Sequence, residues 1–400
     1  MMPTFKIKDR EIGGNSPCYI IAEVSCNHEG DFNEARRIIE AAAAAGADAA
    51  KLQTYTADTM TRDFQTRPKG TMWENIDLYK LYQKAHTPWS WHKDLKKVAD
   101  DCGIHLFSTP FDETAVDHLM EMNAPVLKVA SFEAIDIKLL EKIASTGLPV
   151  IISNGMTDFL EMDESIRTLR SYGTKDLAVL HCNSGYPASF DEVNLRTIPV
   201  IADYFGVVAG ISDHTIYADD KNLTAPMAHV TPLEAVKFGA SIIELHLMMD
   251  REKGRRLNEK NEGGFDWPFS REPAELKKLV SLVRQYEKMG SADYESEAER
   301  TAARRTHGRV CFDPTEKEIK SRILRPSLWV VQDIRKGEKL IFCGGEAGNF
   351  DSIRPTGGLH IRFADFISGK KAACNIKAGS PLQWDMIDIS LLKGRKAVAA

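Results

Sequence analysis

Eight short apolar runs lie between residues 18 and 246, and each is followed by a segment with helical periodicity. The first run is CYIIAEV, the helical segment NEARRIIEAAAAAG follows it, and the last run is ASIIEL. Gly46, Gly147 and Gly239 stand where helix C-caps are expected. Eight strands that alternate with helices predict an α/β fold of the (β/α)8 TIM-barrel type. A doubly wound sheet is the alternative, but AEVSCNHEG lacks the GxGxxG pattern typical of its first turn.

The rest of the chain divides into two further parts. After the helix SREPAELKKLVSLVRQYEKMG, the sequence is charged and has little hydrophobic period, so we expect a flexible linker. Beyond it, DIRKGEKL and NIKAGSPL repeat one pattern of a short strand that enters a glycine turn. The predicted organisation is a barrel domain over residues 1–288, a charged linker over 289–322 and a small β-rich domain over 323–392.

Charge and cysteine content exclude several classes of partner. A net charge of −5 over 400 residues argues against nucleic-acid or anionic-membrane binding, so a bound anion must be held by a few placed cations. The seven cysteines are scattered without a CxxC pair, which indicates neither a disulfide framework nor a zinc ribbon. The N-terminus shows no signal-peptide pattern, and no apolar run approaches the ~18 residues of a membrane span. We therefore expect a cytoplasmic protein.

Two lysines lie inside expected strands, Lys51 in AAKLQ and Lys128 in VLKVAS. Lysine is almost never fully buried without a partner. Each could pair with a nearby carboxylate such as Glu23, and a Schiff-base role is a rival use of the same residue. Because hydroxyl residues follow at the strand ends, where barrels of this kind carry their chemistry, the two lysines indicate a phosphate or carboxylate pocket.

Two histidines end adjacent expected strands, His214 in GISDHT and His246 in SIIELH. A single histidine at a strand end is more often a satisfied hydrogen-bonding residue. A pair on neighbouring strands, together with a carboxylate from Glu23 or Asp213, fits a divalent transition metal with open coordination positions. These residues predict a barrel with an anion pocket and a metal, and they leave the substrate open.

Several longer motifs resemble the sialic acid synthase family. They include KLQTYTADTMT, STPFDETAVDHL, PVIISNGM, GISDHT and SIRPTGGLH, and the resemblance covers nearly the whole chain. Within that family, LYKLYQKAHTPWSWH and CNSGYPA are most similar to pseudaminic acid synthases. The C-terminal part resembles the antifreeze-like (SAF) domain of the family.

The resemblance implies a transferase of carbohydrate biosynthesis. The family condenses phosphoenolpyruvate with an open-chain N-acetylated amino sugar, here a 2,4-diacetamido-2,4,6-trideoxyhexose, to give a nonulosonic acid such as pseudaminate, plus phosphate. It uses a divalent metal, manganese (Mn2+) or magnesium (Mg2+), and works as a homodimer with a domain-swapped SAF module. The alternatives are the same chemistry on another acceptor, as in legionaminate or N-acetylneuraminate synthases, and a non-catalytic sugar-binding homologue.

The resemblance also assigns roles to individual residues. The positions that match those holding phosphoenolpyruvate are Lys51, Thr109, Lys128, Ser131, Ser153, Ser184 and Ser212. The positions that match sugar contacts are Gln53, Tyr186 and Asp266, while Arg354 matches an arginine that the partner subunit lends. Glu23 and Glu133 match central carboxylates, one of which moves protons, and His214 and His246 match the metal ligands.

Departures from the family pattern concentrate on the sugar side. Leu245 replaces a basic residue before the second histidine, and Phe265 replaces a proline in the GGPD segment. Extra residues fall near 217–232 and 251–262, around the expected seventh and eighth strands. We therefore expect the phosphoenolpyruvate half of the site to be intact and the identity of the sugar to be the open question.

Overall fold

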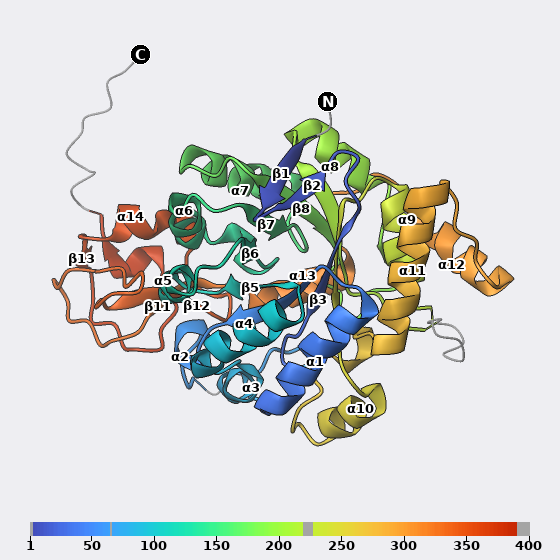
Figure 1. Ribbon diagram of the computed structural model, residues 1–400. Coiled ribbons are helices and arrows are strands. Elements are labelled where there is room, and N and C mark those ends of the chain that lie inside the picture. The colour runs from blue at the N-terminus through green and yellow to red at the C-terminus, as the bar shows by residue number, and fades with distance from the viewer. Residues whose placement is uncertain (1–2, 65, 219–226, 390–400) are drawn as a thin grey trace, which may run out of the picture.

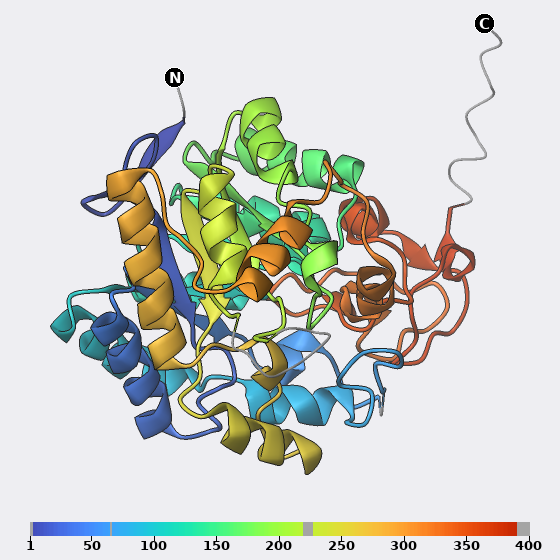
Figure 2. The same cartoon turned by 90° about the vertical axis from the view of Figure 1, so that its right-hand side faces the viewer.

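The computed structural model describes residues 3–64, 66–218 and 227–389, and its centre is a closed barrel of eight parallel strands. Each strand pairs with its neighbour in chain order, and the last pairs with the first (Figures 1 and 2). The strands are β3 (Tyr19–Glu23), β4 (Ala49–Thr54), β5 (His105–Pro110), β6 (Leu127–Val129), β7 (Val150–Ser153), β8 (Leu177–Cys182), β9 (Val208–Asp213) and β10 (Ile242–His246). The predicted TIM barrel is confirmed.

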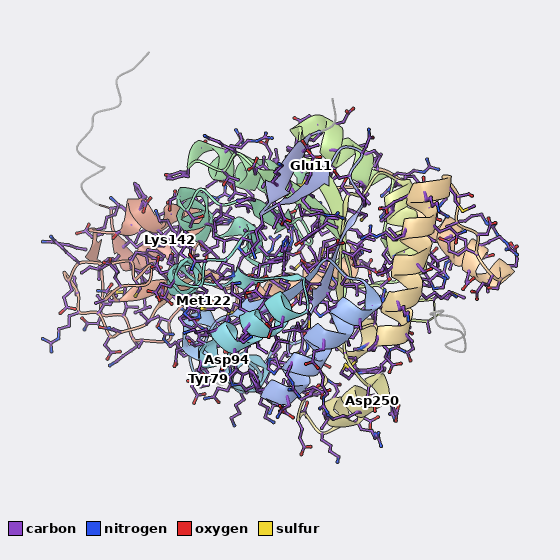
Figure 3. All side chains as sticks on the ribbon, in the orientation of Figure 1. Glu11, Tyr79, Asp94, Met122, Lys142 and Asp250 are labelled. Carbon is purple, nitrogen blue, oxygen red and sulfur yellow. The ribbon has the colours of Figure 1, made fainter. Side chains whose placement is uncertain are left out.

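Helices cover the outside of the barrel. They are α1 (Phe32–Ala45), α4 (His92–Asp101), α5 (Glu113–Glu121), α6 (Ile137–Ser145), α7 (Phe159–Ser171), α8 (Thr197–Phe205), α9 (Val230–Lys237) and α11 (Pro273–Met289). The main core lies between these helices and the strands. Gly46 caps α1 in the left-handed conformation, and Gly147 and Gly239 have positive φ two residues after their helices end. Figure 3 shows charged side chains such as Asp94 and Asp250 on the outer surface.

A hairpin closes the N-terminal end of the barrel. Strands β1 (Thr4–Ile7) and β2 (Arg10–Gly13) pair antiparallel. Phe5, Ile7 and Ile12 of this hairpin form one buried cluster with inward-facing apolar residues of the barrel strands, such as Tyr19 and Phe107. The polar strand ends all lie at the opposite, carboxyl end of the barrel. The hairpin does not cover that end, which is where TIM barrels carry their active sites.

Loops at the carboxyl end carry the shorter helices. The connection between β4 and α4 is long and contains α2 (Ala57–Met60), α3 (Leu78–Ala85) and η1 (Trp89–Trp91). The other short helices are η2 (Glu133–Ile135), η3 (Phe190–Glu192), α10 (Arg251–Glu259) and η4 (Trp267–Phe269). Part of the insertion expected near 217–232 lies outside the described residues, and the insertion at 251–262 forms α10.

The expected linker over residues 289–322 contains helices, so the expectation that it is flexible is wrong for most of residues 297–322. This segment forms α12 (Glu297–His307), α13 (Glu316–Ser321) and η5 (Arg322–Leu324), and α12 packs on the barrel through Ala302 and Ala303. Glu299 on α12 pairs with His229 at 3.1 Å, and His307 bonds to Glu234 at 2.7 Å. The buried face of α12 consists of small alanines among many charged residues, so the sequence shows little of the hydrophobic periodicity that marks an amphipathic helix. Ser296 and Thr315 begin these helices with capping boxes.

The C-terminal module has its own small core. Its elements are β11 (Ser327–Val330), β12 (Phe350–Ile353), η6 (Ile361–Phe363), α14 (Ala364–Ile367), β13 (Lys371–Ala372), η7 (Trp384–Met386) and β14 (Ile387–Asp388). Thirteen buried apolar residues pack together inside it. Residues 390–392, the expected end of this domain, lie outside the described residues. Among the described helices, none has the length and apolar character that a membrane crossing requires.

The module lies beside α5 and α6 of its own chain's barrel, as Figure 1 shows, and ion pairs join it to α6 and α7. The main chain of Arg354 bonds to Met60 at 2.9 Å and accepts the Thr61 hydroxyl at 2.6 Å. On another side, the Ser352 hydroxyl donates to Asp136 at 2.6 Å. These contacts place β12 and the turn after it over the mouth of the barrel.

Candidate active site

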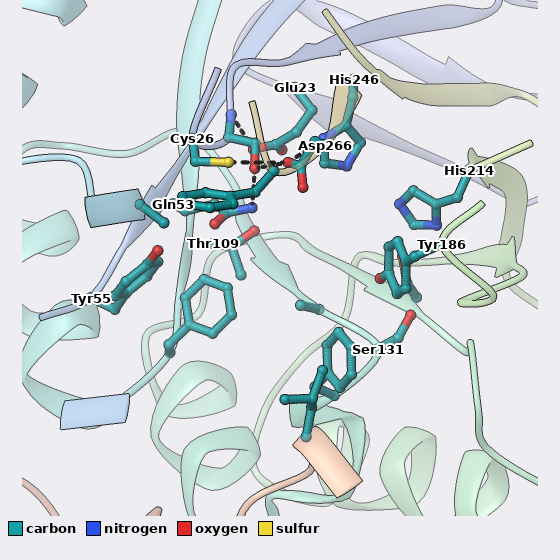
Figure 4. A pocket seen from close by; sticks show the side chains of 18 of the residues that line it. Glu23, Cys26, Gln53, Tyr55, Thr109, Ser131, Tyr186, His214, His246 and Asp266 are labelled. Atoms are coloured by element: carbon teal, nitrogen blue, oxygen red, sulfur yellow. Dashed lines mark hydrogen bonds and ion pairs between the residues drawn. The ribbon is translucent and has the colours of Figure 1, made fainter. Parts of the chain in front are cut away.

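A cavity opens at the carboxyl end of the barrel, and thirteen of the fifteen side chains expected at the site line it. They come from seven strands of the barrel, from the connections that follow β6, β8, β9 and β10, and from the module. Glu133 and Ser184 do not line the cavity, but both are buried at 2% exposure or less directly behind it. Figure 4 shows Glu23, His246 and Asp266 on one side of the cavity and Ser131 and Tyr186 on the other.

The innermost part of the cavity is ionic. Lys51 forms an ion pair with Glu23 and lies 3.8 Å from Glu244. Lys128 lies 3.8 Å from the other oxygen of Glu244 and donates to the Ser153 hydroxyl at 2.7 Å. We call Lys51, Lys128, Glu23 and Glu244 the charged floor. Glu244 was not among the residues expected at the site, and it is the carboxylate that lies between the two lysines.

The charged floor shifts the pKa values of its members in different directions. Burial would raise the pKa of Glu244, but Lys128 and Lys51 lower it to about 2, so this carboxylate is ionised at neutral pH. Burial raises the pKa of Glu23, and Lys51 offsets only part of that effect. Burial also lowers the pKa of Lys128, against the attraction of Glu244. Glu23 is therefore the floor carboxylate that takes up a proton more readily than an ordinary glutamate.

Strand register explains the sequence GISDHT. Ser212 pairs with Glu244 in the ladder between β9 and β10, and its hydroxyl donates to that carboxylate at 2.9 Å. Alternation turns the next residue, Asp213, out of the cavity, where it pairs with Arg271 and both side chains are 1% exposed. Asp213 was one of two carboxylates expected to join a metal site. That expectation is wrong, because the Asp213 carboxylate is paired with Arg271 outside the cavity.

The two histidines lie side by side, as predicted from their neighbouring strands. The ring centroids of His214 and His246 are 5.2 Å apart. Nδ1 of His214 lies 3.1 Å from the carbonyl oxygen of Asn183, and Nδ1 of His246 lies 3.1 Å from Asp266. A proton on each Nδ1 leaves Nε2 as the free lone pair, which is how histidines that bind metals are commonly oriented. Burial lowers the pKa of His214, which favours the neutral ring that a metal needs.

This pair fits a metal ion without forming a complete shell. No cluster of three or more His, Cys, Asp or Glu side chains within the described ranges is already arranged around a common point. Two imidazole nitrogens with Asp266 beside them still form a donor set that a divalent ion accepts, with positions left for water or substrate. His214 and His246 are therefore the residues of this chain that could hold a metal.

A chain of hydrogen bonds runs along the polar side of the cavity. The Gln53 amide donates to the Ser25 hydroxyl at 2.9 Å, and that hydroxyl donates to Asp266 at 2.6 Å. Asp266 also faces His246, which keeps its pKa low although burial would raise it (Figure 4). Gln53 and Asp266, two expected sugar contacts, are thus joined through Ser25, a residue that sequence reasoning missed.

Another part of the cavity is apolar and aromatic. Tyr55, Tyr82, Phe111 and Phe132 form what we call the aromatic wall. Tyr55 packs edge-on against both Tyr82 and Phe111. Further apolar residues extend this surface: Met60, Trp73, Leu81, Ala85, Phe265 and Leu324. Sequence reasoning missed the wall because its residues lie on separate connections at the carboxyl end, with Tyr82 on helix α3, and no local pattern shows that they meet.

Arg354 joins the aromatic wall from the C-terminal module. Its guanidinium pairs with Glu133, donates to the Tyr82 hydroxyl at 2.7 Å and lies 4.8 Å from the centroid of the Phe132 ring. Arg354 is only 4% exposed. The resemblance implies that this arginine comes from a partner subunit, and that stays a prediction; within the single chain described here, Arg354 contacts Glu133 and Tyr82 of its own barrel.

Comparisons with known proteins give the same class of protein as the fold and the site. The chain matches the model of the NeuB family over residues 38–294 and that of the SAF domain over residues 325–388. The chain belongs to the NeuB family. This confirms the resemblance that the motifs indicated.

Two relatives and one solved structure illustrate the range of this similarity. The chain is 34% identical to the pseudaminic acid synthase of Helicobacter pylori, covering 94% of this chain and 99% of that protein. It is 31% identical to the N,N'-diacetyllegionaminic acid synthase of Legionella pneumophila, covering 94% and 96%. The crystal structure of the spore coat polysaccharide biosynthesis protein spsE of Bacillus subtilis aligns with a TM-score of 0.77 at 29% identity, covering 96% and 99%.

Proposed function

We propose that the protein condenses phosphoenolpyruvate with an open-chain N-acetylated amino sugar to give a nonulosonic acid and phosphate. The observation that carries this proposal is the charged floor with its hydroxyls, next to two histidines whose Nδ1 atoms face Asn183 and Asp266, in a chain of the NeuB family. Small trianionic ligands need point cations and hydroxyl donors, and a chain of net charge −5 supplies them only locally.

Phosphoenolpyruvate binds at the charged floor in this proposal. Lys51 and Lys128 are the buried cations, and the hydroxyl groups there belong to Thr109, Ser131, Ser153, Ser184 and Ser212. Lys51 already donates to Thr109 at 3.1 Å, and Lys128 to Ser153, so these donors are oriented before a ligand arrives. Such preorganisation reduces the reorganisation required when charge develops during the reaction.

The bond changes follow from the two substrates. C3 of the enol attacks the sugar aldehyde, whose oxygen takes up a proton. Water then adds at C2, and the C–O bond to phosphate breaks, so the keto acid is released with phosphate. We assign the proton transfer to Glu23, because it lines the cavity with a raised pKa, whereas Glu133 lies behind the cavity and is paired with Arg354.

A divalent metal held by His214 and His246 would polarise the aldehyde as a Lewis acid. Two imidazole nitrogens favour a transition ion such as Mn2+ over Mg2+. The side chains of this chain orient the sugar beside that position: Asp266 and Gln53 lie on the polar side, and Tyr186 lies with its ring centroid 4.6 Å from that of His214.

The acceptor that the cavity fits best is a 2,4-diacetamido-2,4,6-trideoxyhexose. Such a sugar has three methyl groups and few hydroxyls, and the aromatic wall with Met60, Leu81 and Ala85 offers apolar contacts to them. An acceptor of the N-acetylneuraminate type carries more hydroxyls, which this wall leaves without partners. The wall does not choose between the stereoisomers that lead to pseudaminate and legionaminate, so either remains an acceptor.

We also propose a cytoplasmic homodimer. All seven cysteines are free thiols, which suits a reducing compartment. The contacts of Arg354 with Glu133 and Tyr82 support an arginine supplied by its own chain, and the domain-swapped SAF module that the resemblance implies is the alternative.

Phosphate release from phosphoenolpyruvate, measured against a panel of amino sugars with and without chelator, tests the proposal. We expect release only with an acceptor, loss of release after chelation, and the greatest rate with a diacetamido-trideoxyhexose. In ¹⁸O water the label must enter the keto acid, since the C–O bond breaks. Label in phosphate would indicate a phosphatase, and borohydride trapping with pyruvate would indicate a Schiff-base aldolase instead. A sugar-binding homologue would release nothing.

A further inference from the structure

Glu318 on α13 is buried to 5% exposure behind Ser184, whose main-chain N–H it accepts, yet the reaction described above does not use it. Helix α13 lies immediately before the C-terminal module. We propose that Glu318 is a positioning residue that fixes two loops of the phosphoenolpyruvate subsite. This inference rests on the proposed function, because it concerns the same subsite.

The Glu318 carboxylate joins three segments of the chain. Its Oε1 accepts the main-chain N–H of Met156 at 3.1 Å and that of Ser184 at 2.8 Å. Met156 belongs to the loop after β7, and Ser184 follows β8. Its Oε2 accepts the N–H and the hydroxyl of Thr315 at 2.9 and 3.1 Å, which fixes the carboxylate to its own helix.

The same segment also holds the carbonyl groups of the two loops. The Ser321 hydroxyl donates to the carbonyl of Ser184 at 3.1 Å. Arg322 and Arg325 donate to the carbonyl of Met156 at 2.7 and 2.6 Å. Both main-chain polar groups of Met156 and of Ser184 are therefore bonded to residues 318–325. Met156 has a φ of 61°, a conformation that residues other than glycine rarely adopt, and these bonds hold it there.

These loops pack against side chains of the proposed phosphoenolpyruvate subsite. A Cβ on Gly155 would lie 2.1 Å from the Ser184 hydroxyl and 2.7 Å from the Ser131 hydroxyl, so the loops meet with no spare space. Ser153, two residues before Gly155, accepts from Lys128. A small shift of Met156 or Ser184 therefore moves several hydroxyls of the subsite at once.

If Glu318 served only to cap α13, replacing it with Gln should leave phosphoenolpyruvate binding unchanged. Glu318 completes the capping box of α13 with Thr315, and a capping box accepts Gln as well as Glu. A Gln side chain has a single acceptor oxygen. It can therefore accept either from Thr315 at the cap or from the two loop amides, and the other group loses its partner. Glu318→Gln thus keeps the shape of the side chain and removes half of its contacts.

The test compares Glu318→Gln with Glu316→Gln, an exposed change on the same helix that removes the same charge. Titration calorimetry with phosphoenolpyruvate alone, and steady-state kinetics with the best acceptor, give Kd and both KM values. We expect Glu318→Gln to raise the Kd and KM for phosphoenolpyruvate about tenfold, as the loss of hydrogen bonds to a charged group implies, with the sugar KM unchanged.

A Kd and KM for phosphoenolpyruvate within twofold of those of Glu316→Gln would overturn the inference, and so would an equal rise in both KM values. If Glu318→Gln does not fold, Ser321→Ala replaces it, and we expect a rise of about threefold in the phosphoenolpyruvate Kd and none in the sugar KM. An unchanged Kd in Ser321→Ala would then overturn the inference. Failure of the proposed function is a distinct outcome, since the unmodified protein would then neither bind phosphoenolpyruvate nor release phosphate.

Discussion

The charged floor and the aromatic wall lie in one cavity but differ in what builds them. The floor consists of four ionisable side chains on β3, β4, β6 and β10, each bonded to another member or to a hydroxyl. The wall consists of aromatic residues on the connections that follow β4, β5 and β6, with Tyr82 on helix α3, and Arg354 reaches it from a separate module. Strands fix the floor by register, whereas packing among loops fixes the wall.

This difference separates the common half of the reaction from the variable half. Phosphoenolpyruvate is the same in every member of a synthase family, and a rigid ionic site suits it. Acceptor sugars differ in methyl groups and hydroxyls, and a wall built from loops can change without disturbing the barrel. We therefore expect changes in the floor to affect every acceptor equally, and changes in the wall to affect the choice among acceptors.

The largest effect is expected from Lys128→Met in the floor. The substitution keeps the length of the side chain but removes a buried cation between Glu244 and Ser153, which leaves Glu244 with less compensation. We expect kcat/KM for phosphoenolpyruvate to fall by more than about 10³-fold with every acceptor. Lys175→Met, an exposed change, is the control. A loss confined to one sugar would contradict the division between floor and wall.

A second large effect is expected from Arg354→Ala, which tests how the module contributes to the wall. The change leaves Glu133 buried without its cation, and activity should fall by about 10²- to 10³-fold. Mixed dimers of Arg354→Ala with Lys128→Met, isolated through two different tags, should show no activity beyond that of the separate variants. Recovery in the mixed dimer would show that the arginine enters the partner's barrel.

Much of the floor could be predicted from the sequence. Lys51 and Lys128 stand out because a lysine within an apolar strand requires a partner, and His214 and His246 end neighbouring strands. The alternation of strand residues then decides which side chains share the cavity. That rule also corrects the expectation for Asp213, since its neighbours in the sequence point inward and it cannot.

The wall and the linker could not be predicted in the same way. Tyr82 and Phe132 acquire their role from long-range packing, and no local pattern in the sequence specifies which loop aromatics meet. Helix α12 was missed because alanines form its buried face. Glu318 sits in a charged stretch, where a residue that bonds two distant loops looks like any other surface glutamate.

A smaller effect, on selectivity, is expected from Met60→Gln. This residue adjoins the aromatic wall, and the change replaces an apolar side chain with a polar one of similar size. We expect the ratio of kcat/KM for a diacetamido-trideoxyhexose over a hydroxylated N-acetylhexosamine to fall about tenfold. The KM for phosphoenolpyruvate should not change. Met289→Gln, at a methionine that is 66% exposed, is the control. An unchanged ratio would show that the wall does not select the acceptor.

The smallest effect concerns pH and the seam between module and barrel. Glu113 on α5 lies against the turn at Gly344 and Gly345 of the module. Burial, with Asp136 and Asp351 nearby, raises the pKa of Glu113 to about 8, and burial raises the pKa of Asp351 to about 6, against the attraction of Arg62. Because these acids bind protons more tightly in the folded chain, they stabilise it below their ordinary pKa values, and this contribution is lost as pH rises through 6 and 8.

Glu113→Gln should therefore reduce the pH dependence of stability, because the neutral amide resembles the protonated acid. Between pH 5.5 and 8.5 the melting temperature of the unmodified protein should fall more than that of the variant, by about 1–2 °C. Glu121→Gln, an exposed change on the same helix, should leave the fall unaltered. An equal fall in melting temperature in all three proteins would mean that Glu113 does not change its protonation between pH 5.5 and 8.5. A reduced fall would show that the module carrying Arg354 is held more weakly at alkaline pH, while the strands keep the charged floor in place.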